Sequence, residues 1–178
     1  MRKFWCIIFC SNLAYSQIQI YFPQVSNKEH ERALITLPNR QMLSGSSEAV
    51  IRLHDPNGKV LSQEKLGAEL KEIRDIAVTQ KGFIALQSHD SSGIVLLDKM
   101  LQVETLIYPF NKRSALFLDG ICAQENLVFL LGDPIDGFFS TFYSTDYGQH
   151  WQATASKASA NEGEAAYAAS GQTTQIRH

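Results

Sequence analysis

Carboxylates recur at the ends of apolar segments in the second half of the chain, at Asp119, Asp133, Asp136 and Glu164. Grouped carboxylates can attract a basic protein or polar ligand, hold a hard cation, or act in pairs on a glycosidic bond. The pair for glycosidic cleavage would be Asp119 with Asp136. No alternating Asp/Asn spacing of a calcium loop occurs, so we predict no metal site. The same acids can instead cap backbone N–H groups in tight loops, and both interpretations stay open.

The segments that would position these acids are short apolar runs rich in Ile, Val, Leu, Phe and Tyr, separated by turn residues. This pattern is typical of β-strands, and we expect at most one helical turn, between Gln63 and Ile73. The runs repeat in sets of four, and the step from Asp75 to Asp119 gives an interval of about 44 residues. Four antiparallel strands repeated in this way indicate propeller blades. The alternative is a β-sandwich with coincidental spacing.

The repeats predict an all-β fold, a partial and open β-propeller of about three four-stranded antiparallel blades plus the first strand of a fourth. We place an N-terminal strand at residues 17–30, blade 1 at 31–73, blade 2 at 74–117, blade 3 at 118–160 and the incomplete fourth blade at 161–178. Closed propellers typically need about four to eight blades. We therefore expect a truncated form that stays open or self-associates through its blade edges.

Up-and-down strands decide which loops share one end of a propeller. The segments before the first strands and the loops between second and third strands would surround the mouth of the central channel. This predicts a mostly acidic rim with seven candidate binding residues: Asp119, Asp133, Asp136, Glu164, Arg74, Asp75 and His89. We predict that a protein partner or polar ligand binds there.

The most specific motif is Ser144–Trp151, which matches the Asp-box pattern S-x-D-x-G-x-x-W. In a hairpin between third and fourth strands, Asp146 can accept backbone N–H bonds and Gly148 permits a positive φ. Trp151 would fold back as an apolar anchor between sheets. We predict a structural role for this turn, on the face opposite the rim. Weaker versions occur in the other two repeats, at Asp55 and Asp98.

The chain resembles bacterial propellers similar to photosystem II stability and assembly factors, in the sialidase-like BNR-repeat group. The resemblance rests on the Asp box and on three further segments, Phe117–Gly120, Leu131–Phe139 and Gly163–Gly171. The resemblance covers residues 32–175 and implies a propeller that serves protein binding or assembly. Family members are typically longer, so it also implies a truncated member. Some relatives are labelled oxidoreductase, but the chain has no Gly-rich dinucleotide fingerprint, and we expect no cofactor.

Catalytic interpretations find little support in the residues. A sialidase of this architecture needs an arginine cluster for the substrate carboxylate and a tyrosine nucleophile with an acid partner. Only Arg74 is suitably placed on the predicted rim. No Ser-His-Asp order and no zinc-ligand spacing occurs in the sequence. We therefore lean against an enzyme and expect no catalytic residues, and the alternative is a carbohydrate-active, glycosidase- or sialidase-like remnant.

The N-terminus has the features of a cleaved secretory signal peptide. Arg2 and Lys3 precede the apolar run Phe4–Phe9, and small residues end at Ser16. A buried N-terminal strand is the alternative. Cleavage near Ser16 predicts a secreted or periplasmic protein, and the apolar run is too short for a permanent membrane anchor.

Removal of residues 1–16 leaves a mildly acidic chain. It takes away two of the 16 basic residues and none of the 18 acidic ones, so the formal net charge of −2 becomes −4. Such a balance gives no general attraction to nucleic acid. Cys122 becomes the single cysteine, which we expect to behave as a small buried hydrophobe.

Overall fold

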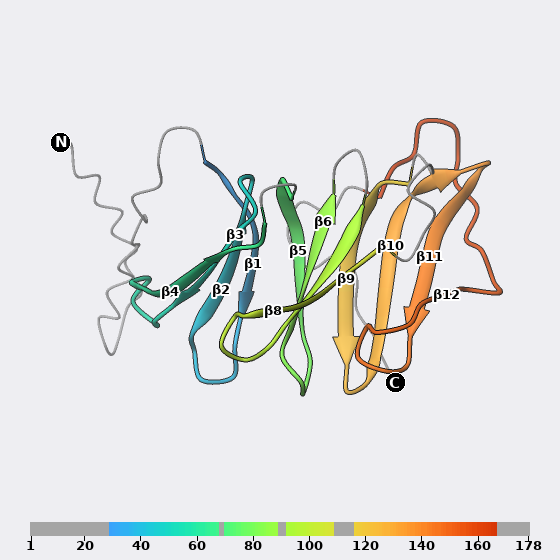
Figure 1. Cartoon of the computed structure of the whole chain (residues 1–178). Helices are drawn as coiled ribbons and strands as arrows, with labels where there is room; N and C mark the ends of the chain where they lie inside the picture. Colours follow the sequence, from blue (N-terminus) through green and yellow to red (C-terminus); the bar gives the residue numbers. More distant parts are fainter. Residues whose placement is uncertain (1–28, 68–69, 89–91, 109–115, 167–178) are drawn as a thin grey trace, which may run out of the picture.

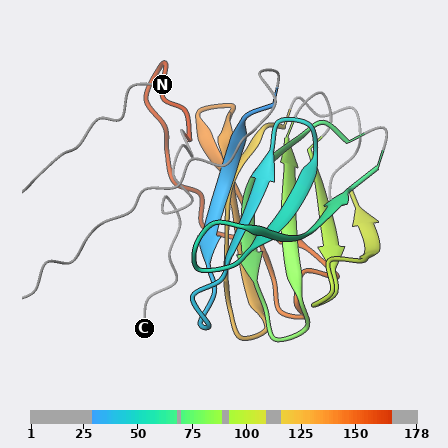
Figure 2. The ribbon, with the colours of Figure 1, turned by 90° about the vertical axis from the view of Figure 1, so that its left-hand side faces the viewer.

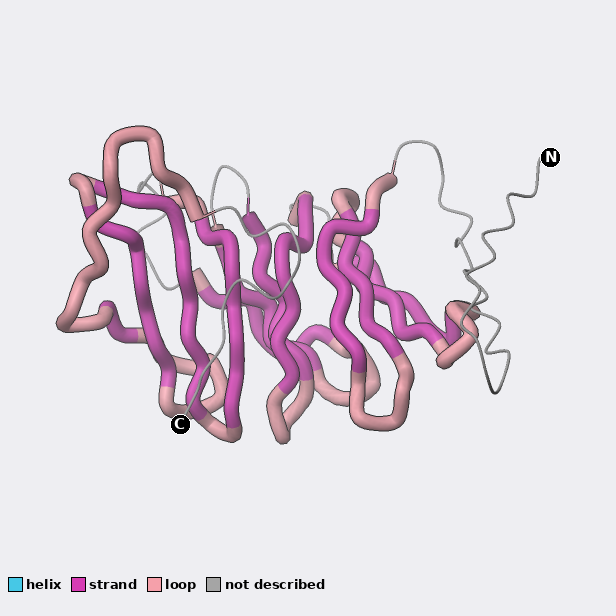
Figure 3. Tube along the Cα trace, turned by 180° about the vertical axis from the view of Figure 1, so that it is seen from behind, coloured by secondary structure: helices cyan, strands magenta, loops and turns pink. Residues whose placement is uncertain are grey.

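The computed structural model describes residues 29–67, 70–88, 92–108 and 116–166. Twelve strands in these ranges form three four-stranded antiparallel sheets, which confirms the predicted open, all-β architecture (Figures 1 and 3). The described ranges contain no helix, and so none that is long and apolar enough to cross a membrane. The predicted signal peptide, nearly all of the strand at 17–30, and His89 lie outside them.

Each sheet is one blade whose strands pair in chain order. Blade 1 contains β1 (Glu31–Thr36), β2 (Met42–Ser46), β3 (Val50–His54) and β4 (Val60–Lys65). Blade 2 contains β5 (Glu72–Val78), β6 (Phe83–Ser88), β7 (Gly93–Leu97) and β8 (Val103–Ile107). Blade 3 contains β9 (Leu118–Gln124), β10 (Leu127–Ile135), β11 (Phe138–Ser144) and β12 (Gln152–Ala153). Strand β5 begins two residues before the start expected at 74, because the polar residues at its beginning hide it from an apolar pattern.

The three blades stand side by side (Figures 1 and 2). The hydrophobic core lies between them. Leu43 and Ile51 of blade 1 pack with Ile73 of blade 2 in one buried cluster. Leu86 of blade 2 packs with Leu130 of blade 3 in the second. A four-stranded blade cannot bury both faces alone, so stacking on a neighbour is what makes the core.

The first strand of every blade contains a β-bulge at the same place. The pairing with the second strand skips Arg32 in β1, Arg74 in β5 and Asp119 in β9. The register therefore makes Asp119 the counterpart of Arg74, whereas the sequence interval had aligned it with Asp75. A bulge inserts one unpaired residue and moves the following residues by one position, which an interval count cannot detect.

The predicted fourth blade is largely outside the described residues. Its expected first strand starts at Ala165, and description of the chain ends at Ala166. The backbone N–H of Ala166 donates to Asp133 Oδ1 over 2.9 Å. The N–H of Leu118, at the start of blade 3, donates in a similar way to Ser92 Oγ of blade 2 over 3.2 Å. In both places a backbone N–H of the chain that leaves one blade donates to a side-chain oxygen of that blade.

Candidate functional site

A row of alternating charges crosses the first strands of the three blades at the predicted rim. Arg32 of blade 1 donates to Glu72 of blade 2, with Nη2 2.9 Å from Oε2. Arg74 Nη1 lies 3.0 Å from the other oxygen of Glu72, and Arg74 Nε lies 2.9 Å from Oδ1 of Asp119 in blade 3. The bulges place Arg32, Arg74 and Asp119 at equivalent positions, so stacked blades bring them next to one another.

Arg74 is the most constrained member of this row. Its guanidinium lies 5.2 Å from the ring centroid of Phe117, in addition to its bonds to Glu72 and Asp119. Burial acts to lower the pKa of Arg74, but the two carboxylates raise it above its ordinary value. The cation therefore stays charged and is fixed in position between blades 2 and 3.

Asp119 and Asp133 are brought together by the fold. Asp119 is 2% exposed, and burial raises its pKa, helped by the nearby charge of Asp133 and opposed by Arg74. Asp133 is half-buried and accepts the backbone N–H of Ala166. Of the two acids, Asp133 is the one that a partner in solution can reach.

Asp75 serves the junction between blades 2 and 3. Its Oδ1 accepts the N–H of Ile76 and its Oδ2 accepts the N–H of Ile121 in blade 3, both over 2.9 Å. The side chain is buried, and burial raises the pKa of Asp75 to about 6 against the effect of these two bonds. Asp75 is thus an interblade connection and is not on an accessible surface.

Asp136 and Glu164 do not join the other acids. Asp136 is exposed at a positive φ of 54° in the turn between β10 and β11. Glu164 is exposed and accepts the backbone and side-chain N–H groups of Asn161, which lower its pKa. In the part of the chain that the structure describes, neither carboxylate contacts Asp119 or Asp133.

The geometry does not favour Asp119 with Asp136 as a glycosidase pair. A general acid must reach the glycosidic oxygen, yet Asp119 is buried and bonded to Arg74. Asp136 is exposed in a different turn. Asp119 is thus not positioned to protonate a glycosidic oxygen while Asp136 acts as base or nucleophile on the same bond.

Arg32 and Glu72 were missed by the sequence analysis. They join the row through hydrogen bonds of 2.9 and 3.0 Å, although Arg32 itself is exposed. A usable signal existed, because both residues lie next to the apolar run of a first strand. The apolar pattern alone could not show that stacking of blades 1 and 2 would bring the two side chains together.

The Ser144–Trp151 turn lies at the opposite end of blade 3 (Figure 1). Ser144 Oγ donates to Asp146 Oδ1 over 2.7 Å and accepts the N–H of Gly148 over 2.9 Å. Asp146 also accepts the N–H groups of Gln149 and His150 over 3.1 and 2.9 Å. Although burial acts to raise it, the bonds from His150 and Ser144 bring the pKa of Asp146 to about 2. The turn is a closed hydrogen-bonded unit.

The same turn packs blade 3 against blade 2. Trp151 is half-buried, contacts the cluster between the two blades, and donates Nε1–H to the carbonyl of Gly148 over 2.8 Å. Gly148 has φ 87°, and a Cβ there would lie 2.9 Å from Ile84 Cδ1 of blade 2. Only glycine satisfies both the conformation and the close approach.

The corresponding turns of blades 1 and 2 use a similar device. Asp55 and Asp98 each accept two backbone N–H bonds, from residues two and four positions later, over 2.8 and 2.9 Å. The blade 2 turn has Leu101 at a positive φ of 66° where blade 1 has Gly58. Aspartate therefore closes the third-to-fourth strand turn in all three blades.

Comparison with known proteins bears on the fold. No family model and no curated protein sequence matches the chain. Among solved structures, YCF48 bound to D1 peptide is 18% identical with a TM-score of 0.53, over 69% of this chain and 39% of that chain. A protein of unknown function from Bacteroides caccae is 13% identical with a TM-score of 0.54, over 76% of this chain and 48% of that chain.

These likenesses show architecture only, because both identities are low. The neighbouring structures are β-propellers. The present chain spans less than half the length of either neighbour. The chain therefore has a propeller-like fold of three described blades.

Proposed function

We propose that this chain is an exported, non-catalytic β-propeller fragment that acts as a protein-binding or assembly scaffold. The observation that carries the proposal is the separation of charges at the rim. Arg32, Glu72, Arg74 and Asp119 neutralise one another within the row described above. Asp133 and Glu164 form no ion pair within the described residues; Asp133 is half-buried and Glu164 is exposed.

The accessible charge of the rim is therefore negative. A basic segment of a partner protein would be steered to it and fixed by hydrogen bonds to carboxylates that are already held in place. Asp133 is oriented by Ala166 and Glu164 by Asn161. The neighbour YCF48 is described with a bound peptide, which is consistent with peptide recognition by this fold.

The proposal includes membership of the Asp-box, BNR-repeat propellers, as a truncated member. Support comes from the hydrogen-bonded Ser144–Trp151 turn and from the related turns at Asp55 and Asp98. Export is supported by the signal-like residues before Ser16. N-terminal sequencing of the mature protein is expected to begin at Gln17, and an intact Met1 would rule out cleavage there.

The rim is tested by removing charge while keeping hydrogen-bond acceptors. The double variant Asp133→Asn, Glu164→Gln is expected to lose partners that the wild-type chain captures from native extract, identified by mass spectrometry. A matched control is Glu104→Gln, Glu125→Gln, which removes the same charge from exposed positions away from the rim. Identical captured proteins for both double variants would reject the rim as the binding surface. Capture should also weaken with added salt, since exposed charges are screened over about 10 Å at 0.1 M.

A further inference from the structure

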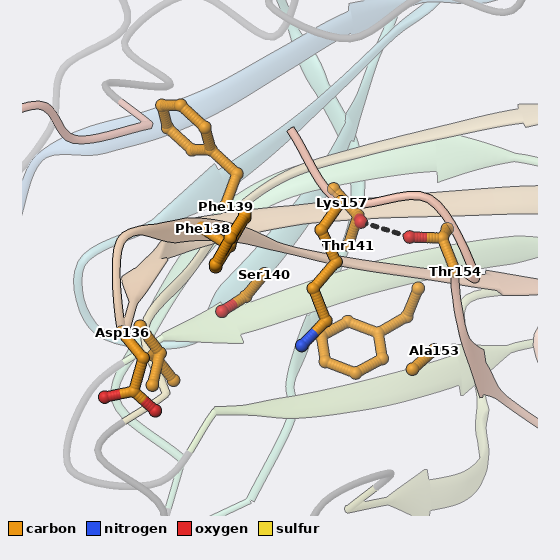
Figure 4. Close-up of a pocket in the computed structure, with 10 residues that line it drawn as sticks. Asp136, Phe138, Phe139, Ser140, Thr141, Ala153, Thr154 and Lys157 are labelled. Atoms are coloured by element: carbon orange, nitrogen blue, oxygen red, sulfur yellow. Dashed lines mark hydrogen bonds between the residues drawn. The ribbon is translucent and has the colours of Figure 1, made fainter. Parts of the chain in front are cut away.

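A groove of about 360 Å³ lies on the outer edge of blade 3 (Figure 4). It arises because β12 pairs with β11 over two residues only. After the bond from Thr154 N to Thr141 O, the outer segment leaves β11 and returns where Phe139 N donates to Ala158 O. Between these two hydrogen bonds β11 covers two residues, from Thr141 to Phe139, while the outer segment covers four, from Thr154 to Ala158. The extra residues of the outer segment loop away from the edge of β11. The resulting space is within the size range of small-molecule sites, about 300–1,000 Å³.

Ser140 contributes a hydroxyl to the wall of this groove. Ser140 lines it and is 9% exposed, yet its hydroxyl makes no hydrogen bond to any residue that the structure describes. Its oxygen is not among the buried polar atoms that lack a partner in the described ranges, so it is open to the groove. A free donor and acceptor at this position is what a polar ligand would satisfy.

Two charged residues of opposite sign line the same groove. Figure 4 shows Asp136 at one end, Thr154 at the other and the ammonium of Lys157 between them. No ion pair joins Asp136 and Lys157 within the described ranges, and Lys157 Nζ instead lies 5.9 Å from the ring centroid of Phe138. The groove therefore has no net charge, and it offers both a strong acceptor and a strong donor.

Apolar surface completes the groove. Phe138 is 43% exposed and Ile135 is 41% exposed, although both are large hydrophobic residues. The electron-rich face of an aromatic ring attracts groups that carry partial positive charge on hydrogen. A suitable ligand is thus neutral, both donates and accepts hydrogen bonds, and has one face of C–H groups.

We propose that this groove binds a neutral pyranose sugar. The hydroxyls of a sugar can donate to Asp136, accept from Lys157 and exchange bonds with Ser140, while its C–H face packs on Phe138. Asp136 is the single carboxylate among the lining residues, whereas glycoside hydrolysis typically needs two. The inference is therefore binding without cleavage, at a site separate from Asp133 and Glu164 of the rim.

The test titrates the full chain with D-glucose, D-galactose, D-mannose and N-acetyl-D-glucosamine, by saturation-transfer NMR and calorimetry. At least one sugar is expected to bind saturably, with Kd on the order of 1 mM. Ser140→Ala should weaken binding about fivefold to tenfold, the effect of one hydrogen bond. Its urea midpoint should not change, since no described partner is lost. Lys157→Met should weaken binding similarly, and the control Ser62→Ala, at an exposed position of β4, should not.

Three results would overturn the proposal. The first is that none of the four sugars binds saturably. The second is that binding is unchanged in both Ser140→Ala and Lys157→Met. The third is that phenylacetate, used as an apolar anion, binds more tightly than every sugar and is lost in Lys157→Met alone, which would identify an anion site. Sugar binding should persist in Asp133→Asn, Glu164→Gln, so failure of the rim and failure of the groove are distinguishable.

Discussion

Asp119 and Arg74 occupy equivalent positions in neighbouring blades and carry opposite charges. Their side chains lie 2.9 Å apart, so each neutralises a group that would otherwise be buried as an unpaired charge. Asp133 and Glu164 are held by backbone N–H groups and keep their charge accessible. The function of each acid in this protein follows from its partner and its exposure.

At the residue scale, Trp151→Ala is expected to destabilise the chain by about 3 kcal/mol. The ring contacts the cluster between blades 2 and 3, and its N–H bonds the carbonyl of Gly148. Trp151→Phe keeps an aromatic ring and loses that hydrogen bond, so its cost should be about 1 kcal/mol. Urea denaturation followed by circular dichroism measures both. A midpoint that barely moves in Trp151→Ala would mean that the ring contributes little to blade packing.

A second residue-scale prediction concerns Cys122. It is half-buried, and burial together with the charge of Asp75 raises its thiol pKa from 9.0 to about 11. The thiolate is the reactive species, so alkylation by iodoacetamide at pH 8 should be about a hundredfold slower in the folded chain than in urea. Mass spectrometry of the peptide containing Cys122 gives both rates. Equal rates would show that the thiol is neither buried nor near a negative charge.

At the scale of the elements, the bulged first strands organise both the core and the rim. Each bulge shifts one residue out of the ladder. In β5 and β9 the second residue after the bulge packs against the preceding blade. Ile76 and Ile121 follow the bulges of β5 and β9 and are each 3% exposed. The bond from Ile121 N to Asp75 connects β5 to β9 directly. Stacking of the blades is therefore supported by apolar contacts and by one buried acid.

Asp75 gives this junction a defined pH dependence. Its carboxyl titrates near pH 6 in the folded chain and near about 3.9 when unfolded. Between these values the folded state binds more protons, so the stability contributed by Asp75 is fully present below about pH 4 and is lost as pH rises through about 6. Asp75→Asn should cost about 1–2 kcal/mol at pH 4, and the difference from wild type should shrink towards pH 7. Denaturation curves at pH 4, 5, 6 and 7 test this, and a constant difference would contradict it.

At the scale of the whole molecule, the three blades form an open row with two outer faces (Figure 1). Leu34 follows the bulge of β1, the position that Ile76 and Ile121 occupy in β5 and β9. It is 59% exposed, whereas its two counterparts are buried against the preceding blade. An exposed apolar residue at an interblade position is a surface on which another sheet can pack.

The chain is therefore expected to self-associate, with an apparent mass that rises with concentration in analytical ultracentrifugation. Leu34→Lys should reduce the association, because a charged side chain opposes burial at the face. Met100→Lys is the matched control, since Met100 is 76% exposed in the turn between β7 and β8. A concentration-independent monomeric mass for the wild-type chain would refute self-association. Equal effects of the two variants would show that the blade 1 face is not the contact.

The sequence by itself determined the strand content, the four-stranded repeat and the chemistry of the Ser144–Trp151 turn. These depend on local rules, because alternation has a period of two residues and the bonds of Asp146 reach no further than four. Only the tertiary structure decided that Arg74 pairs with Asp119 and that Asp75 accepts a hydrogen bond from the neighbouring blade. It also decided that Asp136 lines an outer groove. Those contacts join residues about 45 apart or depend on single-residue bulges and strand insertions. They are consequences of how the blades stack, which no local pattern contains.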